Sequence, residues 1–287
     1  MSFKAFWSRL TLVGNFTLES PLRIGGEGDS LAVDSTGQPI LPGSSFRGAL
    51  RAYIESVLRG IEGEEQVTHR TIMLRGADGL PAPSSRLVQR ACDSTDKRDD
   101  DLNYQGCLTR VIVARWEKDP ILGPKLDEAL VECSCSVCRL FGAPWIAGRV
   151  QVADLRIVDT WDGSLAQRGG LSLSRDRDVM IEGSSYQRSA VPAGTQFSVQ
   201  ITVENATPAE QGLLLVGLRA FEAGLVPLGA DRARGFGYGR LTFDWPNCRE
   251  IDSEHLISVL LGAEAQPFSD ADAEARINAF AASLRTP

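Results

Sequence analysis

The chain has 287 residues, of which 43% are hydrophobic, and it carries 30 basic against 37 acidic residues for a formal net charge of -7. This length and apolar content suffice for one large domain or two ordinary ones, and they exclude disordered and fibrous classes. No run approaches the ~18 apolar residues of a membrane span, and the first residues lack a signal-peptide pattern. We therefore expect a cytoplasmic protein with no membrane partner.

The net acidity opposes long-range attraction to nucleic acid, but it is unevenly distributed. Residues 92–132 carry 10 acidic against 6 basic side chains, and residues 246–287 carry 7 against 3, which leaves a net charge of +1 for the rest. Of the 30 basic residues, 26 are arginines, whose planar guanidinium grips phosphates and stacks on bases. Arginine-rich codon usage is the alternative explanation of this excess.

The first half begins with an alternating, β-branched and aromatic segment over residues 6–18, which predicts a strand. A glycine-rich stretch follows at residues 24–29, and turn signals lead into a helix that begins at Ser44 or Ser45 and runs to about Arg59.

One face of this helix is apolar, since Phe46, Leu50 and Ile54 recur at intervals of four. Arg47 and Arg51 share a different side. The free backbone N–H groups of the first turn offer a seat for a phosphate.

Five cysteines lie close together in an irregular middle segment, residues 60–148, which fits neither half of the chain. Cys135 and Cys138 form a C-x-x-C pair, whose spacing lets two thiolates reach one tetrahedral ion. We expect Cys92 and Cys107 to complete a closed, structural zinc site, with Cys133 as a substitute for either. Reduced core cysteines and a redox C-x-x-C are the alternatives.

The second half repeats the scheme of the first. An alternating strand over residues 149–159 precedes a strand over 197–203, a helix from Thr207 or Pro208 to Phe221, and a final strand over 241–245. This order of strands and helices is the split βαβ pattern of a ferredoxin-like (RRM-like) α+β fold, βαββαβ. We expect domain boundaries at residues 1–246, with residues 60–148 as a zinc-binding insertion and 247–287 as an acidic tail containing a helix near 271–284.

A second glycine-rich segment, residues 229–240, lies between the last predicted helix and strand, which is the reverse of the order in a dinucleotide-binding turn. Its Arg-Gly-Phe-Gly run at 234–237 matches the first four positions of an RNA-recognition signature. The side chains that would contact RNA are Arg232, Arg234 and Arg240 by charge and Phe236 or Tyr238 by stacking. A tight turn that packs on its own sheet is the alternative.

The sequence offers few candidates for catalysis. It has two histidines in dissimilar surroundings and no G-x-S-x-G, P-loop or H-E-x-x-H motif. Asp29, at the end of the first glycine-rich loop, has the chemistry to hold a divalent cation or to accept a proton from a ribose 2′-hydroxyl. A turn-capping role is the alternative for this loop aspartate.

The run from Ile24 to Arg51 resembles the opening motif of the RAMP superfamily of CRISPR-associated proteins, and the chain most resembles the backbone subunit of type III effector complexes. The segments 135–142, 191–197 and 234–237 are similar, in order, to that family's cysteine knuckle, the segment after its thumb and its C-terminal glycine-rich loop. The region 179–190 corresponds to the thumb and is shorter than is usual in the family.

The resemblance implies that several copies of the chain line up along a guide RNA with other CRISPR subunits. Cleavage of the paired target RNA through Asp29, with Mg²⁺ or Mn²⁺, is implied as well, although the Asn-Pro that usually follows this aspartate is missing. The guide contacts that it implies are made by Gly43, Ser44, Ser45, Arg47 and Arg51. Two alternatives stay open at this point, a non-catalytic RAMP scaffold whose partner cleaves and a nucleotide-binding enzyme that uses the glycine-rich loops.

Overall fold

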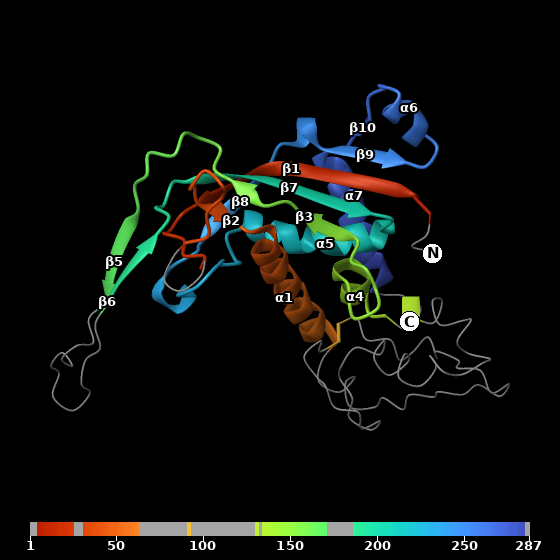
Figure 1. Cartoon of the computed structure of the whole chain (residues 1–287). Helices are drawn as coiled ribbons and strands as arrows, with labels where there is room; N and C mark the ends of the chain where they lie inside the picture. The colour runs from red at the N-terminus through yellow and green to blue at the C-terminus, as the bar shows by residue number, and fades with distance from the viewer. Residues whose placement is uncertain are drawn as a thin grey trace.

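The computed structural model describes residues 5–25, 31–62, 91–92, 130–131, 134–170 and 186–284. Within them an antiparallel sheet lies on a layer of helices, so the α+β class predicted from the sequence is confirmed (Figure 1). The helices are α1 (Gly43–Glu62), α4 (Ser136–Phe141), α5 (Pro208–Glu222), α6 (Leu256–Leu260) and α7 (Asp270–Ser283). The strands are β1 (Ser8–Leu18), β2 (Ile40–Leu41), β3 (Val150–Val152), β4 (Leu155–Arg156), β5 (Ala166–Gly170), β6 (Tyr186–Ala190), β7 (Gln196–Glu204), β8 (Gly239–Phe243), β9 (Arg249–Asp252) and β10 (Gln266–Pro267).

Strand β1 is the centre of the main sheet, whose order is β10-β9-β1-β7-β3 with β8 also paired to β1. Strand β7 pairs along one edge of β1, from Arg9 opposite Glu204 to Thr17 opposite Gln196. Strands β8 and β9 share the other edge, opposite residues 14–18 and 8–11. Between them lies the buried Cys248, whose Sγ accepts the N–H of Val13 at 3.4 Å.

The helical layer covers the face of the sheet that carries the apolar residues of each alternating strand. Phe16 of β1 meets Phe46 of α1 and Phe221 of α5 edge to face, with ring centroids 6.1 and 6.2 Å apart, and the two helical rings stack at 4.5 Å. These three side chains are fully buried and join the two predicted amphipathic helices to the first strand.

The bounds predicted from the sequence for β1, β7, β8, α1, α5 and α7 lie within three residues of the observed ones. The predicted strand 149–159 differs, because it is divided into β3, which pairs with β7, and β4, which pairs with β2. The division places Asp154 where its carboxylate accepts the N–H of Gly43 at 2.8 Å. The start of α1 thus has a side-chain hydrogen-bond partner at the point where the predicted strand is divided.

Strands β5 and β6 form a two-stranded ladder that projects from the body (Figure 1). Residues 186–190 of the predicted thumb are β6, and residues 179–185 lie outside the described residues. Of the predicted insertion, the structure describes the end of α1, residues 91–92 and 130–131, and the segment from Ser134 onward.

The predicted acidic tail contributes to the folded core. Strand β9 extends the main sheet along β1, and α7 packs on α5 so closely that a Cβ on Gly212 would lie 2.0 Å from the carbonyl oxygen of Arg276. The helix starts at a capping box in which Ser269 and Asp272 bond each other's backbone N–H. No helix in the described parts of the chain is long and apolar enough to cross a membrane.

Candidate functional site

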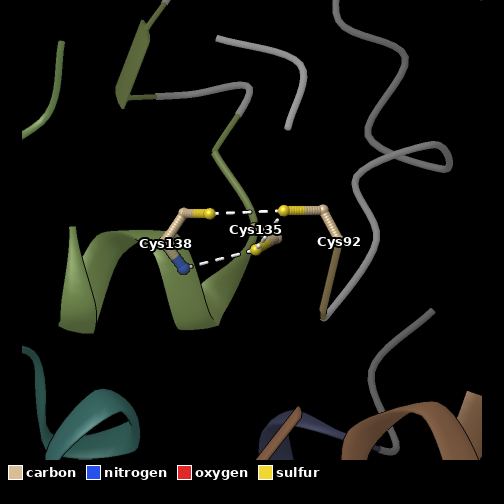
Figure 2. Close-up of side chains that lie close together, drawn as sticks. All are labelled: Cys92, Cys135 and Cys138. Carbon is tan, nitrogen blue, oxygen red and sulfur yellow. Dashed lines mark hydrogen bonds between the residues drawn. The ribbon is translucent and has the colours of Figure 1, made fainter. Parts of the chain in front are cut away.

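Three of the predicted zinc ligands, Cys92, Cys135 and Cys138, lie together in the structure (Figure 2). The Sγ of Cys92 is 3.3 Å from that of Cys138 and 3.6 Å from that of Cys135. Thiolates 2.3 Å from a tetrahedral zinc ion lie about 3.8 Å apart, whereas the sulfurs of a disulfide lie about 2.05 Å apart. The three buried thiols are therefore free cysteines that lie within 4.8 Å of one another, and two of their separations are close to that of zinc-bound thiolates.

The knuckle is held by its own backbone. Cys135 is the N-cap of α4, and its Sγ accepts the N–H of Cys138 at 3.3 Å. Hydrogen bonds from the thiols of Cys138 and Cys92 hold the pKa of the Cys135 thiol well below its usual range, against the opposing effect of burial. A stabilised thiolate is the form that binds a metal ion.

Cys107 and Cys133 lie outside the described residues, so their part in the site stays a prediction. Within the ranges that the structure describes, the cluster offers three thiols and no fourth ligand.

The predicted guide contacts at the start of α1 are packed against the β3–β4 connection. A Cβ on Gly43 would lie 2.2 Å from the carbonyl oxygen of Val152 and 2.7 Å from that of Ala153, so only glycine fits without a shift. Its N–H is bonded to Asp154, which already places an anion at the first turn. Ser44 is exposed and Ser45 is half-buried.

Arg47 and Arg51 have protein partners. Arg47 donates to the carbonyl oxygens of Val150, at 3.0 Å, and Phe141, and its guanidinium lies 5.6 Å from the centre of the Phe141 ring. Arg51 donates to Glu55 at 2.8 Å and to the carbonyl oxygen of Gly142 at 3.0 Å. Both side chains thus tie α1 to α4 and its surroundings, and their contact with RNA stays a prediction.

The second glycine-rich segment lies against residues 19–24, which lead into the first. The Gly237 N–H donates to the carbonyl oxygen of Pro21 at 2.9 Å, and the Ala230 N–H donates to that of Arg23 at 2.8 Å. At Gly237, where φ is +81°, a Cβ would lie 1.8 Å from the carbonyl oxygen of Leu228. The glycines therefore bring the second glycine-rich segment into backbone contact with the residues that precede the first.

The predicted RNA-contacting side chains of this segment differ in exposure. Arg232, Arg234 and Arg240 are exposed; Arg234 bonds Asp231 at 2.8 Å, and Arg240 bonds Glu19 at 2.5 Å. Phe236 is buried with the guanidinium of Arg168 5.4 Å from its ring centre, whereas Tyr238 is exposed. Among these residues a stacking face for a base is available at Tyr238 rather than at Phe236.

Two arginines on the β5–β6 ladder were not among the predicted contacts. Arg168 and Arg188 face each other directly across the two strands, and Arg188 also lies 3.5 Å from the carboxylate of Asp231. Together with Arg234, whose guanidinium lies 2.8 Å from the same carboxylate, they form what we term the arginine group. The pairing of strands 20 residues apart creates this group, and no local sequence pattern marks it.

Asp29 lies outside the described residues, so its role stays a prediction. The nearby Asp34 caps a turn, since its carboxylate accepts the hydroxyl and N–H of Thr36 at 2.6 and 2.8 Å. These bonds from Thr36 lower the pKa of Asp34, with a smaller contribution from Arg156.

Residues 15–240 match the family model of the RAMP superfamily. No curated protein matches the chain. Because the match covers most of the sequence, the chain belongs to the RAMP superfamily, whose members are CRISPR-associated, RNA-binding proteins that act in complexes with RNA and other subunits.

Proposed function

We propose that this protein is a guide-RNA-binding backbone subunit of a type III-like CRISPR effector complex, built on a ferredoxin-like core. The pairing order β8-β1-β7-β3, with α1 and α5 on one face, supports the ferredoxin-like description, because a βαββαβ chain gives this order of its four strands. Family membership supports the CRISPR-associated role.

The arginine group is the observation that carries the RNA-binding proposal. Two like charges directly opposite each other on neighbouring strands are unfavourable unless an anion lies near them. Among the described residues, the three arginines of this group surround the single carboxylate of Asp231, and Tyr238 of the second glycine-rich segment is exposed. Such a surface suits the phosphates and stacked bases of single-stranded RNA.

Recognition of this kind depends on the RNA backbone. Arginine side chains bind phosphates of any sequence, while base pairing between guide and target supplies the sequence information. A subunit that repeats along a guide needs this sequence tolerance, and a basic surface that contacts phosphates provides it.

The RNA-binding proposal is tested by purifying the protein with a co-expressed guide RNA. We expect a long RNA to copurify, with a raised 260/280 nm absorbance ratio that falls after nuclease treatment and at high salt. A bound mononucleotide that resists nuclease would instead indicate a nucleotide-binding enzyme and contradict the proposal.

Cleavage of the target RNA belongs to the same proposal, with Asp29 as the catalytic residue and Mg²⁺ or Mn²⁺ as the metal ion. In a reconstituted complex, Asp29→Ala is expected to abolish cleavage at periodic sites while target binding is retained. Asp34→Ala is the control, because Asp34 caps a turn with Thr36 and should not be required. Undiminished cleavage by Asp29→Ala would favour a non-catalytic scaffold whose partner cleaves.

We further propose that Cys92, Cys135 and Cys138 bind structural zinc, with Cys107 as the fourth ligand. The separations of the three sulfurs and the lowered pKa of Cys135 support this proposal. When bound, zinc would crosslink the knuckle to the chain around Cys92. Metal analysis of the purified protein tests it, and a folded, metal-free protein would contradict it.

A further inference from the structure

The polar side of α1 faces the cysteine centre, which we define as Cys92, Cys135 and Cys138. Arg51, Glu55 and Arg59 follow one another at intervals of four along this side of the helix. Glu55 lies 2.8 Å from Arg51 and 3.7 Å from Arg59. Arg59 in turn donates to the carbonyl oxygen of Cys92 at 2.9 Å, so the helix contacts the backbone of one proposed ligand directly.

Arg51 reaches the other side of the same centre. Its Nη1 donates to the carbonyl oxygen of Gly142, the residue that ends α4 and whose own N–H bonds the carbonyl oxygen of Cys138 at 2.9 Å. Its Nη2 is buried and has no hydrogen-bond partner among the residues that the structure describes. A buried guanidinium nitrogen without a partner is costly unless a negative charge lies near it.

Glu55 and two thiols of the cysteine centre are the groups that supply negative charge near Arg51. Burial acts to lower the pKa of Arg51, but the hydrogen bond and the charge of Glu55 raise it, and Cys138 and Cys92 raise it further. Arg51 is thus favoured in its charged form by Glu55 and by two of the three thiols of the centre.

A zinc ion with three thiolates carries a net charge of -1, and one with four carries -2. A nearby cation stabilises such a charge in a buried site, because burial removes the water that would otherwise stabilise it. Arg59 is less suited to this role, since its side chain is 45% exposed against 21% for Arg51.

We infer that Arg51 is the half-buried counter-ion of the cysteine centre and positions the Cys138 side of it, rather than being a ligand of the guide RNA. The inference rests on the proposed zinc site. Helix α1 then has two roles. One side buries Phe46 and Leu50 in the core, and another side balances the charge of the metal centre.

The test compares zinc affinity in the full-length protein, using release of zinc to a chromogenic chelator. Arg51→Gln removes the charge and is expected to weaken zinc binding by about 10- to 100-fold, the usual effect of losing a partner of a metal ligand. Arg51→Lys keeps the charge and is expected to retain affinity within a few-fold. Arg9→Gln is the control, because Arg9 is an exposed arginine that pairs with Glu204 across β1 and β7.

Cobalt substitution adds a direct readout, because the thiolate-to-cobalt absorption band reports the ligands themselves. Equal zinc affinity in wild type and Arg51→Gln would overturn the inference, and so would equal losses in the glutamine and lysine variants. If Arg51→Gln does not fold, the result for Arg51→Lys tests the inference by itself. Zinc binding retained in Arg51→Lys supports the inference, and zinc binding lost in Arg51→Lys overturns it. Absence of zinc from the wild type would instead contradict the zinc proposal itself.

Discussion

At the scale of single residues, Gly43 shows how a residue assigned to ligand binding by resemblance also has a packing requirement. Its missing side chain lets α1 start against the carbonyl oxygens of Val152 and Ala153. Its N–H donates to the carboxylate of Asp154, which lies between β3 and β4. A glycine at this position is therefore required by the fold whether or not RNA contacts it.

Gly43→Ala is expected to destabilise the protein by about 1–3 kcal/mol, because the added Cβ would overlap two carbonyl oxygens. Urea unfolding measures the change. Gly48→Ala is the matched control in the same helix, where a Cβ meets no atom within 4 Å, and it should raise stability by up to about 1 kcal/mol. Equal stability of the two variants would contradict the close contact of Gly43 with the carbonyl oxygens of Val152 and Ala153.

At the scale of elements, a buried ion pair joins the start of β3 to the start of α5. Arg149 lies 2.5 Å from Glu210, and the exposed fractions of these residues are 5% and 6%. Arg139 of α4 lies 3.0 Å from the other carboxylate oxygen, and Glu210 also accepts the N–H of Thr207 in the capping box of α5. One carboxylate thus fixes a strand and two helices relative to one another.

Glu210→Ala is expected to cost about 3–5 kcal/mol of folding free energy, because it leaves the Arg149 charge buried without this partner. The double variant Arg149→Met/Glu210→Met should lose less than Glu210→Ala alone. Glu222→Ala, at the exposed end of the same helix, should cost about 1 kcal/mol or less. Chemical denaturation measures the folding free energy of these variants. A double variant less stable than Glu210→Ala would contradict the prediction that the buried charge of Arg149 causes the loss.

Helix α7 gives a pH-dependent prediction. Hydrogen bonds from the hydroxyl and N–H of Ser269 lower the pKa of Asp272 below its ordinary value. The stability contributed by this carboxylate is therefore present above pH 4 and is lost as the pH falls through the lowered pKa. Between pH 6 and pH 3 the wild type should lose more stability than Asp272→Asn, as measured by thermal unfolding, and parallel curves would contradict this assignment.

At the scale of the whole molecule, local patterns predicted the long elements and the three cysteines that meet. Strand alternation and helical periodicity are local signals, so β1, β7, α1 and α5 could be predicted from their own residues. The arginine group and the neighbours of Arg51 depend on which distant segments pair, and no short-range pattern encodes this. Packing also decides that Phe236 is buried, that β9 joins the main sheet and that α7 joins the core, although β9 and α7 lie in an acidic part of the sequence.

The whole-molecule charge is consistent with this arrangement. The acidic segments 92–132 and 246–287 account for the net negative charge, and the arginine group lies outside both. Local concentration of arginines, rather than the overall charge, therefore sets the potential that RNA would encounter near the β5–β6 ladder.

The salt dependence of RNA affinity tests whether the arginine group binds RNA. For single-stranded RNA each phosphate contact contributes about 0.7 to the slope of log affinity against log salt concentration, so Arg168→Gln/Arg188→Gln should reduce that slope by about 1.4 and weaken binding at low salt. Arg9→Gln should leave both unchanged. The same slope and affinity in the double variant and the wild type would contradict the proposal that the arginine group binds RNA.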